Sequence, residues 1–96
     1  MIKHVICFKL KEGAEESRKQ VREVLAGMEG RVPQIRDVAV HLDELRSPRS
    51  FDVILEVLVD SWEALESYQK DEYHCEVVKK YLNTVVERSV AMDFEV

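Results

Sequence analysis

Alternation of apolar and polar residues predicts four β-strands in this chain. Residues 3–10 alternate, with His4, Ile6, Phe8 and Leu10 on one side, which is typical of a strand with one strongly apolar face. The same period of two predicts strands over 36–44, 51–59 and 87–96. The strand over 51–59 is the richest in β-branched residues.

Helical periodicity predicts two helical regions between these strands. Apolar residues at i, i+3, i+4 and i+7 predict a helix over 14–29, which Gly30 ends. The second region begins at Asp60, which we expect to act as N-cap, with Glu63 three positions on as in a capping box. This helix carries Trp62, Leu65 and Tyr68. We expect it to break near Lys70 and Asp71 and to be followed by a further helix over 72–83, on which one face holds His74, Val77, Val78 and Tyr81.

The predicted order is therefore β-α-β-β-α-β, the ferredoxin-like arrangement of the α+β class. In this arrangement the helices pack on one face of a four-stranded antiparallel sheet. The pattern predicts one domain over residues 1–96.

The sheet face without helices is predicted to be unusually apolar. Its predicted residues are Val5, Cys7, Ala39, Ile54, Leu58 and Ala91, interleaved with Lys9, His41, Asp52, Glu56 and Asp93. An apolar patch of this kind usually marks an interface. Pairing two such faces about a two-fold axis would bury them, so we expect a homodimer through the sheet face.

Composition and charge narrow the function classes. The chain has 96 residues, 46% hydrophobic and 34% charged, with a net charge of −5, so it carries no basic footprint for nucleic acid or anionic lipid. No stretch approaches the roughly 20 apolar residues that a membrane span needs, and the apolar start is too short for a signal peptide. Cys7 and Cys75 lack metal-site spacing and form no disulfide framework, which favours a reducing cytoplasm. We expect a cytoplasmic protein without a metal or cofactor.

The segments of the chain, taken together, resemble the stress-responsive A/B barrel (Dabb) family. The resemblance rests on KHVICFKLK at the start, VPQIRDVAV after the first helix, SFDVILEVLVDSWEALESYQKDEYH, and the closing hydrophobic strand. It implies a ferredoxin-like protomer that dimerises sheet to sheet into a dimeric α+β barrel. The best-understood activity in the family is that of a plant enzyme, olivetolic acid cyclase, which folds a linear polyketide thioester by aldol condensation.

The resemblance also suggests catalytic residues. Tyr68 and, six residues on, His74 resemble the catalytic pair of that cyclase, and His4 corresponds to its histidine on the first strand. Val53 stands where the cyclase has a further pocket histidine, which is a departure from its pattern. In such chemistry a histidine removes a proton alpha to a carbonyl and a tyrosine hydroxyl stabilises the resulting oxyanion.

Helical geometry limits how these residues can meet. Six residues on one straight helix turn through about 600°, which would leave Tyr68 and His74 roughly 120° apart, so only the predicted break brings them together. His4 and His74 both lie on faces expected to be buried beneath the helices. The predicted pocket between sheet and helices is formed by His4, Tyr68 and His74 with Ile6, Phe8, Val53 and Val78.

Three functions remain open from the sequence. The first is a binder of a small hydrophobic or aromatic molecule with cyclase-like acid–base chemistry. The second is a non-catalytic, stress-associated structural dimer, in which His4, Tyr68 and His74 are a buried polar cluster that satisfies its own hydrogen bonds. The third is a cofactor-free monooxygenase, which rests on analogy with related dimeric barrels.

Overall fold

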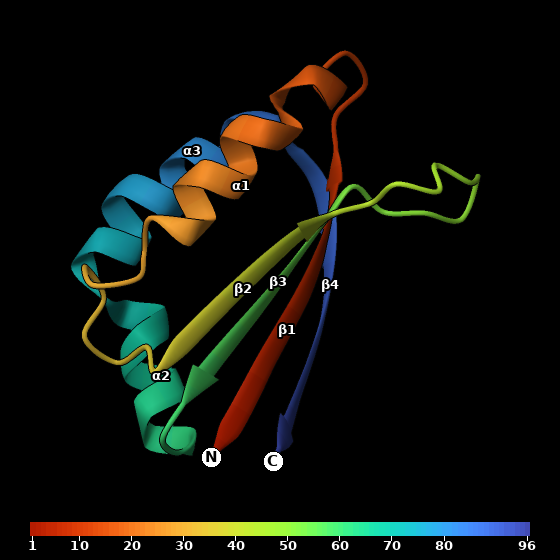
Figure 1. Cartoon of the computed structure of the whole chain (residues 1–96). Coiled ribbons are helices and arrows are strands. Elements are labelled where there is room, and N and C mark those ends of the chain that lie inside the picture. Colours follow the sequence, from red (N-terminus) through yellow and green to blue (C-terminus); the bar gives the residue numbers. More distant parts are fainter.

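The computed structural model describes residues 1–96 and contains one four-stranded antiparallel sheet. The strands lie in the order β2-β3-β1-β4, and their bounds are β1 (Ile2–Leu10), β2 (Asp37–Leu42), β3 (Val53–Val59) and β4 (Val86–Glu95). All helices lie on one side of this sheet, and the other side is open (Figure 1). The predicted ferredoxin-like α+β arrangement is confirmed, and each predicted strand is found close to its predicted bounds.

The first helical region is a 3-10 turn, η1 (Glu15–Ser17), followed by α1 (Arg18–Ala26). The second begins with α2 (Trp62–Lys70). Its cap is Ser61 and not Asp60, because the Ser61 hydroxyl accepts a hydrogen bond from the Ala64 amide at 3.1 Å. The Asp60 carboxylate instead accepts two hydrogen bonds from Arg36, at 2.8 and 2.7 Å.

The predicted break in this region is confirmed at Asp71. Its ψ of 136° ends α2, and its carboxylate accepts a hydrogen bond from the His74 amide at 3.1 Å. The chain then forms a π-helix, η2 (His74–Lys79), which runs directly into α3 (Lys80–Val85). The π-helix was not predicted from the sequence, because its apolar spacing differs little from that of an α-helix over so short a segment.

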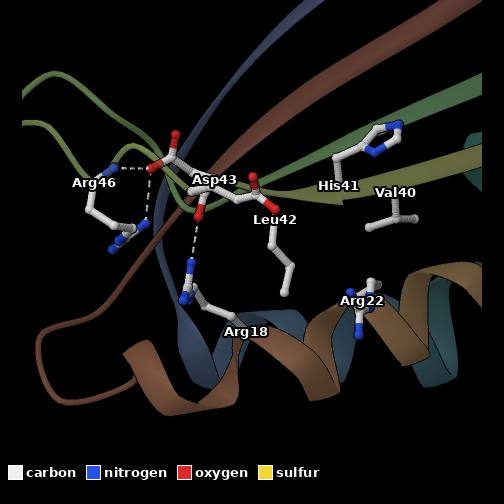
Figure 2. Close-up of a pocket in the computed structure, with 8 residues that line it drawn as sticks. Arg18, Arg22, Val40, His41, Leu42, Asp43 and Arg46 are labelled. Carbon is white, nitrogen blue, oxygen red and sulfur yellow. Dashed lines mark hydrogen bonds and ion pairs between the residues drawn. The ribbon is translucent and has the colours of Figure 1, made fainter.

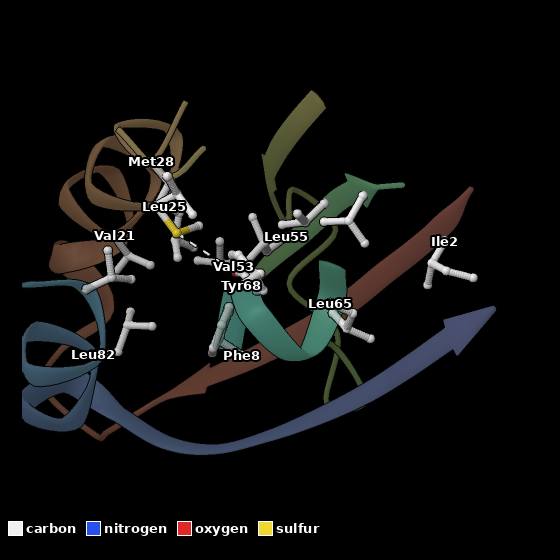
Figure 3. Close-up of a cluster of buried hydrophobic side chains, with 14 of the residues drawn as sticks. Ile2, Phe8, Val21, Leu25, Met28, Val53, Leu55, Leu65, Tyr68 and Leu82 are labelled. Atoms are coloured by element: carbon white, nitrogen blue, oxygen red, sulfur yellow. Dashed lines mark hydrogen bonds between the residues drawn. The ribbon is translucent and has the colours of Figure 1, made fainter. Parts of the chain in front are cut away.

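The core lies between the sheet and the helices (Figure 3). The inward residues of β1 and β3 alternate as predicted, and each apolar side chain removed from water contributes about 1.5–3 kcal/mol. The buried apolar side chains of these two strands are Ile2, Phe8, Leu10, Val53, Leu55, Val57 and Val59. From the helical side, Val21, Leu25, Met28 and Tyr68 pack against them.

The prediction for β4 assigned its two faces the wrong way round. The register pairs His4 with Asp93 and Ile6 with Ala91, so Asp93 and Ala91 face the helices and not the open side. The open face instead carries Val90, Met92 and Phe94, which are 55%, 70% and 40% exposed. The prediction failed because it assigned the more apolar set of an edge strand to the core.

Asp52 was also wrongly predicted to lie on the open face. Its side chain is 1% exposed. The carboxylate accepts hydrogen bonds from the Leu10 amide at 2.7 Å and from the Arg46 guanidinium at 2.6 Å. Burial opposes ionisation, but these two partners and Lys9 outweigh it and lower the pKa of Asp52. Asp52 thus ties the loop between β2 and β3 to the end of β1.

We predict that Asp52→Ala lowers the free energy of unfolding by about 1.5–3 kcal/mol, because it leaves the Leu10 amide buried without an acceptor. The lowered pKa of Asp52 means that its contribution is present at neutral pH and is lost as the pH falls below about 4. Urea unfolding at pH 7 and at pH 3 measures both effects. Asp60→Ala, which removes an exposed partner of Arg36, is the matched control and should change stability far less. Equal losses in the two variants at pH 7 would contradict the prediction.

Candidate functional site

A cavity of about 520 Å³ lies over the inner faces of β1 and β4 and beneath the helices η2 and α3. Half of its wall is apolar, consisting of Ile6, Phe8, Leu25, Leu55, Leu82, Val86 and Ala91. The other half is polar, consisting of His4, Gln69, His74, Lys79, Asn83, Ser89 and Asp93. A wall that combines apolar side chains with polar groups suits a small organic molecule. We call this cavity the histidine pocket.

His4 is fixed in the pocket by Asp93. The two residues are opposite each other in the β1–β4 register, and the His4 Nδ1 atom is hydrogen-bonded to an Asp93 carboxylate oxygen. His4 itself is 4% exposed. A carboxylate on one ring nitrogen sets the orientation of the imidazole and leaves Nε2 for other partners.

Asp93 is the site residue that sequence reasoning missed. It was assigned to the open face, because Val90, Met92 and Phe94 were assigned to the core. One signal in the sequence could have found it. A histidine buried on β1 needs a hydrogen-bond partner, and the closing strand of a ferredoxin-like sheet pairs directly with the first.

His74 lines the pocket and carries a buried, unpartnered nitrogen. It is 8% exposed, and its Nδ1 atom is buried without any hydrogen-bond partner in the protein. Burial, helped by the charges of Lys79 and His4 and opposed by Asp71 and by the main chain of Gln69, lowers the pKa of His74 to about 4. The ring is therefore uncharged at neutral pH. A buried polar atom without a partner is uncommon in a folded protein and indicates a group that awaits a ligand or water.

Tyr68 lies between the two histidines but behind the pocket wall. Its ring centroid is 5.8 Å from that of His4 in a T-shaped arrangement and 4.5 Å from that of His74. The residue is fully buried, and its hydroxyl donates to the Met28 sulfur at 3.9 Å (Figure 3). Burial and the negative charge of Asp71 raise the pKa of Tyr68. Tyr68 thus supports both imidazoles from the core side.

The structure brings most of the predicted site residues together. His4, His74, Ile6 and Phe8 line the histidine pocket. Tyr68 is packed against both histidines without lining it. Val53 and Val78, which were also predicted to line the pocket, are buried in the core instead. Val53 lies opposite Phe8 in the β1–β3 register, and its side chain is covered by the core and not by the pocket.

A second hollow, of about 440 Å³, lies between α1 and the end of β2 (Figure 2). Its wall is mostly charged, and its polar groups are largely bonded to one another. Arg18 donates to the main-chain carbonyl of Asp43 at 2.7 Å, and Arg46 bonds the carboxylates of Asp43 and Asp52. Only Val40 and Leu42 offer apolar surface. This hollow is a weaker candidate for an organic ligand than the histidine pocket.

No group of three or more His, Cys, Asp or Glu side chains is placed to hold a metal ion. No helix has the length and apolar character needed to cross a membrane.

Comparison with known proteins identifies the family and the fold. The profile of the Stress responsive A/B Barrel Domain (Dabb) matches residues 2–96. No curated protein matches the sequence. Among solved structures, a dimeric ferredoxin-like protein of unknown function from Bacteroides fragilis has a TM-score of 0.83 at 21% identity, over 99% of this chain and 95% of that chain.

Two other solved structures are similar over the whole chain. The protein At3g17210 from Arabidopsis thaliana has a TM-score of 0.85 at 17% identity, over 100% of this chain and 95% of that chain. An antibiotic biosynthesis monooxygenase has a TM-score of 0.77 at 13% identity, over 100% of this chain and 98% of that chain. At these identities the likeness concerns the fold.

We predict that His74 makes the protein less stable in mild acid. Because folding lowers the pKa of His74 to about 4, the unfolded chain binds the proton more readily between that pH and its usual pKa of about 6.5. The free energy of unfolding should therefore fall as the pH drops through this window, by roughly 2–3 kcal/mol from this residue alone. Urea unfolding of the wild type and of His74→Gln at pH 7, 5.5 and 4 measures it, because the other titrating groups are common to both. Parallel pH dependences in the two proteins would contradict the assignment.

Proposed function

The chain belongs to the stress-responsive A/B barrel family, and from that premise we propose that it binds a small aromatic or acyl compound in the histidine pocket. The cavity of about 520 Å³ is within the usual range for organic ligands, and its apolar half would contact the body of such a compound. The polar half would fix its orientation. A purely structural dimer has no need of such a cavity.

The observation that carries this proposal is the free Nδ1 atom of His74. The protein buries this atom, gives it no partner, and keeps the ring uncharged at neutral pH. Leaving a buried polar atom unsatisfied costs about 1–3 kcal/mol. A ligand hydroxyl would offset that cost if rotation of the ring turned Nδ1 toward the pocket, so binding would be strongest for compounds that bond this atom.

The same arrangement supports acid–base chemistry on a bound carbonyl compound. The uncharged His74 would accept a proton alpha to the carbonyl, and His4, oriented by Asp93, would stabilise the developing oxyanion in its imidazolium form, in which Nε2–H is a donor. This division of roles fits an aldol cyclisation of the kind that the family resemblance suggests. The donor role predicted for Tyr68 stays a prediction, because its hydroxyl would have to leave the Met28 sulfur to reach a ligand.

The second candidate is a cofactor-free monooxygenase. It is favoured by the likeness to an antibiotic biosynthesis monooxygenase and by a pocket with an apolar half that would accept a flat aromatic ring. At 13% identity that likeness concerns the fold, so the chemistry is carried by analogy. Oxygen consumption with quinone-like aromatics would distinguish it from a cyclase, which consumes no oxygen.

We also propose that the protein is a homodimer through the open sheet face. The solved neighbour from Bacteroides fragilis is described as dimeric. In this chain the open face carries the Lys3–Glu56 ion pair and a set of apolar side chains on neighbouring strands, which are Val5, Cys7, Ile54, Leu58, Val90, Met92 and Phe94. Exposed apolar surface of this kind is costly in water and is stabilised when a second copy covers it.

We predict that His74→Ala lowers turnover at least a hundredfold in a cyclisation assay with linear polyketide thioesters, because general-base catalysis contributes about 10²–10⁴-fold. Product formation is followed by absorbance, and thermal unfolding confirms that the variant is folded. Cys75→Ala is the matched control, because Cys75 is adjacent in sequence and does not line the pocket. Unchanged turnover in His74→Ala would contradict the catalytic role of His74 and would leave the binding proposal standing.

We predict that Met92→Asp converts the dimer into a folded monomer. A carboxylate at this position, now 70% exposed in the protomer, would be buried against the partner without a counter-charge. Sedimentation velocity measures the mass, and circular dichroism shows whether the fold persists. Val77→Asp places the same charge at an exposed apolar residue on the helical side and should leave the mass unchanged. A wild-type protein that sediments as a monomer would refute the homodimer.

A further inference from the structure

We propose that Lys79 makes the histidine pocket selective for acids, so that its ligand is a carboxylate carried on an aromatic or acyl body. This inference rests on the proposed function, because it concerns the ligand of the same pocket. It adds the charge of that ligand, which neither the family match nor the structural neighbours supply.

Lys79 is exposed and has no partner in the protein. Two other lysines of this region are paired along their helices, Lys70 with Glu66 at 3.1 Å and Lys80 with Glu76 at 2.8 Å. Lys79 lines the pocket and has no carboxylate within ion-pair distance. The ammonium group at the pocket wall is therefore free to bind an anion.

The π-helix η2 carries both His74 and Lys79. Five residues along an α-helix turn through about 500°, which would leave these two side chains roughly 140° apart. The π-helix η2, with hydrogen bonds from i to i+5, brings them round to the same side, and both line the cavity. π-helical turns are rare and often occur at functional sites. This one places a cation beside the unpartnered imidazole.

The charge balance of the pocket also favours an anionic ligand. Asp93 is the only carboxylate in the wall, and it is already bonded to His4. The charge of Lys79 acts inside the cavity, since it contributes to the low pKa of His74. A bound carboxylate would offset this charge and so make His74 more basic. An acidic ligand would then improve the base that acts on it.

The apolar wall decides which class of anion fits. Ile6, Phe8, Leu55 and Ala91 lie on the strand side of the cavity and offer no hydrogen bonds from their side chains. Inorganic anions would lose hydration there without gaining partners. An aromatic or acyl acid would place its body on this wall and its carboxylate at Lys79.

The test compares 2-naphthoate with its neutral analogue 2-naphthamide by isothermal titration calorimetry at pH 7 and low salt. We expect naphthoate to bind about five to ten times more tightly, as one charge-assisted contact would give. Lys79→Gln should remove this preference, and Lys79→Glu should reverse it in favour of the cation 2-naphthylmethylamine. Lys80→Gln is the matched control, because Lys80 is the next residue and does not line the pocket. Amide shifts of Ser89 and Ala91 in NMR spectra locate the probes.

Naphthoate preferred by the wild type and by Lys80→Gln, but not by Lys79→Gln, supports the inference. Equal binding of naphthoate and naphthamide to the wild type, or a preference that survives in Lys79→Gln, overturns it and leaves the proposed function standing. If neither probe shifts the pocket amides at millimolar concentration, the proposed function fails and the inference fails with it.

Discussion

The register between β1 and β4 is the constraint on which the rest of this structure depends. It places Asp93 opposite His4 and Ala91 opposite Ile6, so that the edge strand turns its polar and small residues toward the helices. Because successive side chains point to opposite faces of a strand, a slip of one residue would move every side chain of β4 to the other face of the sheet. Met92 would then enter the pocket, and Asp93 would lie among the apolar side chains of the open face. The pocket and the apolar face are thus two consequences of one pairing.

Much of the fold could be predicted from the sequence, because β1 and β3 obey the simple rule that the more apolar face is buried. The buried residues that follow it are Ile2, Phe8 and Leu10 on β1 and Val53, Leu55, Val57 and Val59 on β3. β4 breaks the rule, since Val90, Met92 and Phe94 face away from the helices. Apolar side chains seek any surface that removes them from water, and a single sequence does not show whether that surface is the protein's own core or another chain.

The site could be predicted only in part, because its residues meet through local backbone geometry. The break at Asp71 could be foreseen, and it brings the rings of Tyr68 and His74 to 4.5 Å. The π-helix that follows could not, because it inserts no glycine or proline and leaves the apolar pattern intact. The direction of the Tyr68 hydroxyl, toward Met28 and away from the pocket, depends on packing between segments 40 residues apart, which no local pattern encodes.

The edge strand β4 couples the histidine pocket to the open face of the sheet, because it contributes side chains to both. This strand is bonded on one side only, to β1, and nearly all of its residues are exposed in the protomer. Such a strand opens more readily than the strands at the centre of the sheet. Its inner residues Ser89, Ala91 and Asp93 form one wall of the pocket, while its outer residues are exposed in the protomer. Whatever packs on the outer side therefore orders the backbone that holds Asp93 against His4, so the two surfaces gain their stability together.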